Sequence, residues 1–340
     1  LSAIPNGTLL TLTITFNQGQ KNFNIWIRDP QYVNSYIVAI DNSTNALPQS
    51  GINKAEIIFE TIVAPGITRY LAVFDPYKDV EKIGPVRSAR SSFLDIAFGF
   101  KSAFAHCGGS SDALYRLPAD NIVNLDEIYG SGTYFYRSND RVAPHNLYTN
   151  SQLINDGIIS KDAQAEVYSN PFPMGEMLGG EIYPSAVVKY YGQYHSTEFK
   201  WNSAKQRYEK YFNEKMLALK DGSPIIADNV IVIYAEHESK YAGENVVQAK
   251  LIGNGRAVFY RSGKRWTGTW TKNSENENFT FNVNDEAMIF SPGNIWVLIA
   301  EEDRSNELSN ITVNAGKMTP HFSPEISNYI IKLPAGYTGT

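Results

Sequence analysis

Five arginines stand within one stretch of the chain, and arginine is the side chain best suited to hold an anion. Its planar guanidinium presents several N–H donors in a fixed fork that matches a carboxylate, phosphate or sulfate group. If the fold brings three or more of them together, they form an anion-binding cleft. The alternative is that each one pairs with a nearby Asp, Glu or backbone carbonyl and only stabilises the fold. The five are Arg69, Arg87, Arg90, Arg137 and Arg141.

A turn of small and polar residues, His106 to Asp112, follows an apolar run. It predicts a strand-to-helix turn, whose backbone N–H groups can bind an anion at the start of the helix. Gly108, Gly109 and Ser110 are therefore candidate binding residues. A simpler interpretation is that a serine of this turn is the N-cap of the helix.

Catalysis by a nucleophile and a base is the second chemistry that these residues allow. Ser110 or Cys107 could attack a substrate with a histidine as base. The histidines are His106 and His145, and Asp41 or Asp75 could assist either of them. No Gly-x-Ser-x-Gly elbow is present, and Cys107 on a strand is more simply a small buried apolar side chain.

The composition excludes several other classes of protein. The 340 residues are 43% hydrophobic and 19% charged, as in an ordinary globular protein. A formal charge of −5 gives no overall attraction for nucleic acid, so any anion site must be local. No two histidines stand at a metal-ligand spacing, and a single cysteine forms no thiol cluster. We therefore expect no metal, no cofactor and no nucleic-acid partner.

The hydrophobic pattern divides the chain into four parts and predicts an α+β fold class. Residues 1–35 and 305–340 alternate apolar and polar positions, which indicates β-sandwich segments at both termini. Residues 36–175 predict an α/β domain, with the clearest helix at 86–98. Residues 176–304 predict a mostly antiparallel β domain. The strands expected in the two domains are 36–40, 67–74, 102–106, 229–234, 246–252, 257–260, 264–271, 279–281, 287–290 and 295–299.

Ten short motifs follow one another along residues 36–303. They are Val38–Asn42, Pro48–Gly51, Gly66–Arg69, Ile83–Arg90, His106–Ser110, Arg141–Tyr148, Asp228–Val232, Gly253–Ala257, Gly263–Trp270 and Pro292–Trp296. In this order they resemble the YerB-type family of bacterial lipoproteins.

This resemblance implies two domains and a location outside the cytoplasm, on the membrane surface, through a lipid anchor beyond the sequence given. It implies no reaction and no catalytic residues, because the family has no established function. The candidate binding residues nevertheless fall on its motifs. They are Arg69, Arg87, Arg90, Arg141, His145 and Asn146.

The two ends of the chain carry a second resemblance. Residues 308–329 are similar to the opening of the cadherin-like β-sandwich repeat of bacterial surface proteins, and residues 8–29 are similar to its closing half. These are either truncated pieces of flanking repeats or one sandwich built from both ends. We favour one sandwich, since an unpaired half would expose its sheet edges.

Three functions follow from these patterns. The favoured hypothesis is that an Arg/His-lined cleft binds an anionic envelope ligand, such as a phosphorylated or carboxylated glycan. One alternative is a hydrolase or transferase acting on an envelope glycan or phosphodiester, so enzymatic activity is left undecided. The other is a scaffold at the cell surface that contacts a protein partner.

Overall fold

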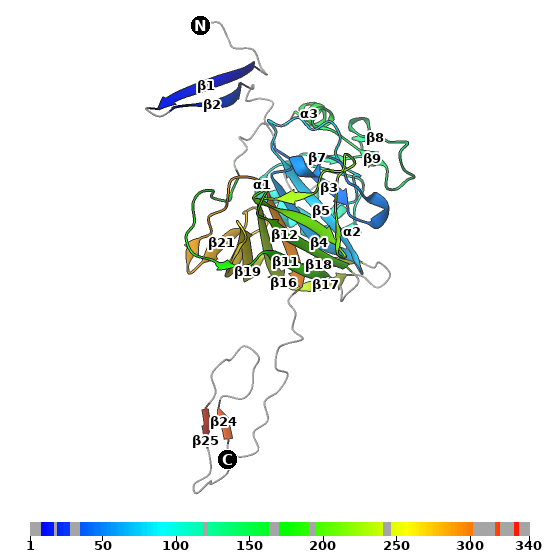
Figure 1. The fold of residues 1–340 in the computed structure, drawn as a ribbon. Coiled ribbons are helices and arrows are strands. Elements are labelled where there is room, and N and C mark those ends of the chain that lie inside the picture. Colours follow the sequence, from blue (N-terminus) through cyan, green and yellow to red (C-terminus); the bar gives the residue numbers. More distant parts are fainter. Residues whose placement is uncertain are drawn as a thin grey trace. The chain divides into compact units, whose positions relative to one another are not determined.

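The computed structural model describes most of the chain, whose course is shown in Figure 1. The described residues are 8–16, 19–27, 35–117, 122–162, 170–190, 195–240, 246–301, 317–319 and 330–332. Residues up to Glu301 form one compact unit, and residues from Glu302 onward form another.

One mixed β-sheet forms the centre of the first unit. Twelve strands belong to it among the described residues. Eleven lie in the order β22-β21-β20-β19-β16-β23-β4-β5-β3-β6-β7, and β10 pairs with β20 beside them. The bounds are β3 (Tyr36–Asp41), β4 (Ile57–Ala64), β5 (Ile67–Phe74), β6 (Ala103–His106), β7 (Asn124–Asp126), β10 (Glu181–Ile182), β16 (Asn229–Ala235), β19 (Gly253–Arg261), β20 (Lys264–Lys272), β21 (Thr280–Val283), β22 (Glu286–Ala287) and β23 (Ile295–Glu301).

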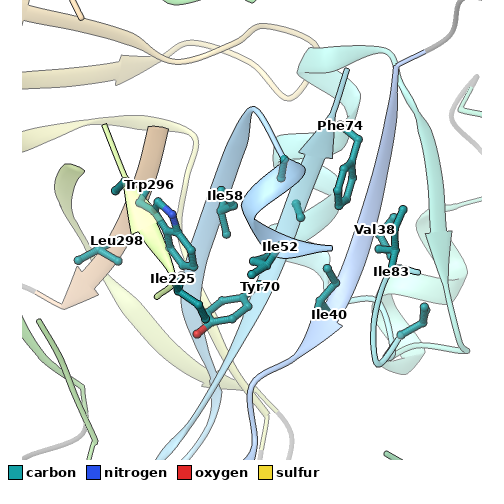
Figure 2. Packing of buried hydrophobic residues seen from close by; sticks show 14 of the residues in the cluster. Val38, Ile40, Ile52, Ile58, Tyr70, Phe74, Ile83, Ile225, Trp296 and Leu298 are labelled. Atoms are coloured by element: carbon teal, nitrogen blue, oxygen red, sulfur yellow. The ribbon is translucent and has the colours of Figure 1, made fainter. Parts of the chain in front are cut away.

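The middle strands of this sheet are buried on both faces. Their nearly continuous apolar runs are typical of strands that are covered on both sides. Because alternate side chains point to opposite faces, each strand contributes to two separate apolar clusters. Figure 2 shows one of them, in which Tyr70 of β5 and Trp296 of β23 pack edge to face with ring centroids 5.2 Å apart.

A second, five-stranded antiparallel sheet covers the face that carries this cluster. Its Phe199 ring lies with its centroid 5.2 Å from that of Trp296, and Tyr208 belongs to the same cluster. The strands are β11 (Ser185–Tyr190), β12 (His195–Asn202), β13 (Arg207–Phe212), β14 (Lys215–Met216) and β15 (Ile226–Ala227).

Helix α1 covers the opposite face of the central sheet. Its Phe93, Leu94 and Phe98 are buried in the second cluster together with Leu71 and Val73 of β5. The helices and the remaining short elements of this unit are α1 (Ser91–Phe100), α2 (Ser111–Arg116), α3 (Ser151–Ser160), the 3-10 helices η2 (Thr44–Ala46), η3 (Ile52–Lys54) and η4 (Gly132–Tyr134), and strands β8 (Tyr136–Arg137), β9 (Leu147–Tyr148), β17 (His237–Lys240) and β18 (Val246–Ala249).

The described chain is predominantly β, which corrects the expectation of an α+β fold with an α/β first half. The reason lies in the connection between β4 and β5. These strands are joined by a tight antiparallel turn at Gly66, whose φ of 71° suits glycine, and not by a helical crossover. Helices connect only later strands of this half: α1 lies between β5 and β6, and α2 lies between the parallel strands β6 and β7 among the described residues.

The helix expected at residues 86–98 begins later, at Ser91. The preceding segment is held in extended form against β3. Asp41 N donates to Pro85 O over 2.8 Å, and Arg87 N donates to Ala39 O over 2.9 Å. A segment that pairs with a strand in this way cannot also make helical hydrogen bonds.

Strands from both predicted domains meet inside the central sheet. β23, near the end of the second half, lies parallel to β4 of the first half and parallel to β16 of its own. The two halves of the chain, 36–175 and 176–304, therefore share one continuous sheet. Their division into two domains at residue 175 stays a prediction.

The hairpins at the two ends are each a separate two-stranded antiparallel sheet among the described residues. β1 (Thr8–Phe16) pairs with β2 (Gly19–Ile27), and β24 (Lys317–Thr319) pairs with β25 (Ile330–Lys332). Residues 305–316, the start of the predicted C-terminal β-sandwich segment, lie outside the described residues. That the two ends complete one cadherin-like sandwich stays a prediction.

Candidate functional site

The candidate site lies where three parallel strands end. β3, β6 and β7 run in the same direction, so their carboxyl ends meet at one edge of the sheet. Ligands of open sheets with parallel strands commonly bind outside this edge. Asp41 is the last residue of β3, and the antiparallel register places Arg69 of β5 directly opposite it.

The segment 85–90 brings two more arginines to this edge. Its antiparallel pairing with β3 places Arg87 opposite Ala39, near the end of that strand, and Cys107 N donates to Arg87 O over 3.1 Å on the other side. Arg90 then stands at the N-cap of α1. The segment therefore lies between the ends of β3 and β6.

Asp41 is the centre of the resulting group. Its Oδ2 lies 3.1 Å from Arg87 Nε and 2.8 Å from His145 Nδ1, and its Oδ1 accepts from Ser43 N over 2.9 Å. The Asp41 side chain is 2% exposed, whereas those of Arg87 and His145 are 26% and 19% exposed. We name the group of Asp41, Arg69, Arg87, Arg90 and His145 the Asp41 cluster.

The Asp41 carboxyl is ionised by its neighbours. Burial raises its pKa, but the Ser43 N–H, the Arg87 guanidinium and His145 together outweigh burial and bring the pKa below its usual value. An ionised carboxylate on Nδ1 fixes the orientation of the His145 ring. Among the described residues His145 Nε2 makes no hydrogen bond.

Arg69 is the most deeply buried cation of the cluster. The residue is 5% exposed, Nη1 donates to Ser88 O over 2.7 Å, and buried Nε finds no acceptor among the described residues. Burial lowers the pKa of Arg69 well below its usual value, and repulsion from Arg90 and Arg87 lowers it further, while Asp41 opposes them. Three guanidiniums thus lie close enough to repel one another.

Two predicted binding residues, Arg141 and Asn146, make hydrogen bonds to neighbouring loops. Arg141 donates to the backbone carbonyls of Ala46 and Pro48 and so fixes the loop after η2. Asn146 accepts from Arg137 over 3.1 Å and donates to Ser138 O over 3.1 Å. Since their polar atoms hold neighbouring loops, the structure does not bring Arg141 and Asn146 into the ligand-facing part of the cluster.

His106 is also outside the cluster. It is completely buried, with Nδ1 2.8 Å from Gly108 O and Nε2 2.7 Å from Asn124 Oδ1. Asp126 Oδ2 lies 3.7 Å from Nδ1. Both ring nitrogens thus have partners in the interior, so the structure does not bring His106 together with the Asp41 cluster, and its role as a base stays a prediction.

The turn of residues 108–110 is likewise occupied by internal hydrogen bonds. Gly108 N donates to Asp126 Oδ1 over 2.8 Å, and Ser110 N donates to Ala89 O over 3.3 Å. Gly109 bridges to Ala89 in parallel pairing. Ser110 does occupy the N-cap position of α2, as the simpler interpretation expected, but without a capping hydrogen bond from its side chain. These bonds hold the segment 87–90 in place, and anion binding by the turn stays a prediction.

Sequence reasoning missed a buried ion pair on the opposite face of the central sheet, beside Tyr70 and Trp296. Glu60 of β4 and Lys210 of β13 pair with both side chains 0% exposed. Lys210 Nζ also lies 4.5 Å from the ring centroid of Trp296, and Thr68 Oγ1 donates to Glu60 over 3.0 Å. A lysine in a strand of mixed polarity gives no signal that it will point inward, so only the packed structure reveals this pair.

Among the described residues, no three His, Cys, Asp or Glu side chains lie close enough to hold a metal ion. None of the helices in the described ranges has the length and hydrophobicity of a membrane span.

Comparison with known proteins identifies the family. The N-terminal domain of "Protein of unknown function (DUF3048)" matches residues 27–164, and its C-terminal domain matches residues 186–297. The chain belongs to this family. The two DUF3048 matches lie on either side of residues 165–185. All members of the Asp41 cluster lie in the N-terminal match.

The DUF3048 chain is also similar to a protein of Bacillus subtilis (strain 168) described as "Putative lipoprotein YerB". The two are 26% identical over 271 residues, which are 78% of this chain and 80% of the relative. The crystal structure of YerB from Bacillus subtilis superimposes with a TM-score of 0.72 at 24% identity, covering 81% of this chain and 94% of that chain. The expected resemblance to the YerB-type family is therefore confirmed, and this structural match shows a shared fold.

Proposed function

We propose that this DUF3048 protein binds an anionic ligand of the cell envelope at the Asp41 cluster. The observation that carries the proposal is the buried guanidinium of Arg69 beside those of Arg87 and Arg90. The Asp41 carboxylate forms an ion pair with Arg87 and also attracts the charge of Arg69. Two cations on one carboxylate leave an excess of positive charge in a poorly solvated place.

An oxyanion would relieve this excess. A phosphate or carboxylate group presents several acceptor oxygens, which suit the donor forks of Arg87 and Arg69. Its charge would also favour the protonated form of Arg69 and so offset the repulsion between the guanidiniums. Arg87 and His145 are partly exposed and would meet the ligand first. A phosphorylated or carboxylated glycan has this chemistry.

Calorimetric titration of the full chain with inorganic phosphate and with glucuronic acid tests the proposal, and glucose serves as the neutral reference. Arg87→Gln removes one charged donor and should weaken phosphate binding by about tenfold or more. Arg265→Gln is a matched control, because Arg265 is 30% exposed and pairs with Glu181 at 2.6 Å. Loss of affinity in both variants alike, or no binding of either anion by the unaltered chain, would refute the site.

A second candidate function rests on the contact between Asp41 and His145. A carboxylate 2.8 Å from Nδ1 orients a histidine whose other nitrogen can act as a general base on water. Beside the arginines, such a base suits hydrolysis of a phosphodiester. The test is release of nitrophenol from bis(4-nitrophenyl) phosphate. We expect His145→Gln to abolish turnover, because the glutamine amide cannot take up the proton of the attacking water. Absence of turnover in the unaltered chain leaves binding as the function.

We also infer a lipid-anchored, extracytoplasmic location, because the curated relative is named a lipoprotein. The test is metabolic labelling of the natural full-length protein with an alkyne fatty acid, followed by cell fractionation. Label in the membrane fraction that is lost when the acceptor cysteine is replaced supports the location. Unlabelled protein in the cytoplasmic fraction contradicts it.

A further inference from the structure

A second concave site lies outside the Asp41 cluster. A cavity of about 600 Å³ opens between helices α1 and α2 and the strand β18, with the residues that follow that strand. No member of the Asp41 cluster lines it. Its volume falls in the range of ordinary small-molecule sites. The residues that define its chemistry are Ser91, Asp112, Tyr115, Gln248, Lys250 and Ile252.

Negative charges outnumber positive charges around this cavity, whereas positive charges are in excess in the Asp41 cluster. Arg116 lies 2.8 Å from each of two carboxylates, and Lys250 lies 2.9 and 3.6 Å from two more. Both cations are thus fully used. With Asp112, five carboxylates of the described residues line the cavity or pair with its lining, against the lining cations Arg116 and Lys250 and the nearby Lys272, whose charge acts on Asp95 and Glu275. The carboxylates are Asp95, Asp112, Glu236, Glu238 and Glu275.

Asp112 is the carboxylate without a cation among the described residues. Its Oδ2 accepts from Ser91 Oγ and from Gln248 Nε2, both over 2.6 Å, and these donors are neutral. Burial raises the pKa of Asp112, but the hydrogen bonds from Ser110, Ser91 and Gln248 outweigh it and lower the pKa to about 2. The cavity therefore contains a carboxylate that is ionised at neutral pH, held in place and not neutralised.

The rest of the lining is a mixture of hydroxyl, amide, aromatic and aliphatic groups. Ser111 is exposed, Tyr115 is 86% exposed, and Ile252 is 46% exposed. Hydroxyl and amide groups can exchange hydrogen bonds with the hydroxyls of a sugar. The exposed tyrosine ring can cover the apolar face of a sugar ring.

We propose that this cavity binds a small hydroxylated molecule with a primary ammonium group, of the amino sugar class, and that the ammonium pairs with Asp112. The site is separate from the anion site proposed above and has the opposite charge. It does not depend on the proposed function, because the two sites share no residue.

Calorimetric titration of the full chain with glucosamine and with N-acetylglucosamine tests this proposal. At about pH 6 a primary amine is protonated, so the two sugars differ at one nitrogen, which is charged only in glucosamine. We expect glucosamine to bind at least about tenfold more tightly. Equal affinity for the two sugars, or no heat from glucosamine at millimolar concentration, overturns the proposal.

Two variants locate the binding. Asp112→Asn removes the charge and should weaken glucosamine binding by about tenfold or more. Ser111→Lys adds a cation at an exposed position of the cavity lining and keeps the three side chains that hydrogen-bond to Asp112. It should weaken glucosamine binding by a similar factor. This variant tests the proposal if Asp112→Asn does not fold. Asp140→Asn is the matched control, because this exposed carboxylate pairs with Lys220 at 3.0 Å elsewhere. Unchanged glucosamine affinity in a folded Asp112→Asn variant, or in Ser111→Lys, would be decisive against the assignment.

Discussion

Asp41 and Arg69 face each other across the β3–β5 ladder, and both point to the face of the sheet that α1 covers. This register brings a carboxylate and a guanidinium together before any loop contributes. Arg87 and His145 then reach the same carboxylate from segments 46 and 104 residues further along the chain. The cluster therefore depends on the β3–β5 ladder first and on loops second.

The burial of Arg69 predicts an unusual response to its removal. Arg69→Met replaces a repelled, buried cation by an apolar side chain of similar length, so we expect the free energy of unfolding without ligand to fall by no more than about 1 kcal/mol. The increase in melting temperature on adding phosphate should disappear. Urea denaturation with and without phosphate measures both. A loss of several kcal/mol without ligand would mean that Arg69 is a structural partner of Asp41.

The buried pair of Lys210 and Glu60 should behave in the opposite way. Lys210→Met leaves the Glu60 carboxylate buried without a cation, which should cost about 3–5 kcal/mol in free energy of unfolding. Adding Glu60→Gln removes that charge but keeps an acceptor for Thr68, so the double variant should recover most of the loss. A double-mutant cycle by urea denaturation checks this. Additive single effects would show that the pair is not coupled.

Acid should destabilise the protein partly through Asp112. Its folded pKa of about 2 lies below the value of about 3.9 for an unfolded aspartate, so the folded state binds the proton less tightly. The contribution of Asp112 to stability is therefore present above about pH 4 and is lost as the pH falls toward 2. Urea denaturation across this range should show a shallower decline for Asp112→Asn. Parallel curves for the variant and the unaltered chain would contradict the prediction.

Cys107 should react slowly with thiol reagents. Burial raises the pKa of its thiol to about 12, and the hydrogen bond to Glu127 and the charge of that residue act in the same direction. The thiolate is the reactive form, so alkylation by iodoacetamide at neutral pH should be at least about tenfold slower than in the urea-unfolded chain. Glu127→Gln should accelerate it. Equal rates in the folded and unfolded chain would indicate an open thiol.

Hydrophobic patterning predicted the strands whose own residues form an apolar run or an apolar–polar alternation. The strands expected at 36–40, 67–74, 229–234 and 264–271 correspond to β3, β5, β16 and β20. The central strand β4 was not predicted, because Glu60 and Thr61 interrupt its apolar run and the reason for a buried glutamate lies in Lys210, far along the chain. Similarly, the sequence around Val86 does not show whether this residue pairs with a neighbouring strand or begins a helix.

The candidate site could be predicted only in part for the same reason. Arginine clustering in the sequence indicated Arg69, Arg87 and Arg90, which the fold does bring together. Whether an individual arginine is turned toward a backbone carbonyl, as Arg141 is toward Pro48, depends on loop geometry that no spacing encodes. The cavity at Asp112 was missed because Gln248, its partner from β18, lies 136 residues further along the chain.

The position of β23 bears on how the chain is synthesised. Since β23 lies between β4 and β16, an emerging polypeptide has the long, apolar edge of β4 open until residue 301 has left the ribosome or translocon. An unpaired edge of this kind is a template for association with other chains. A nascent chain that ends within the second DUF3048 segment would thus present an unpaired strand edge to other chains until β23 is made.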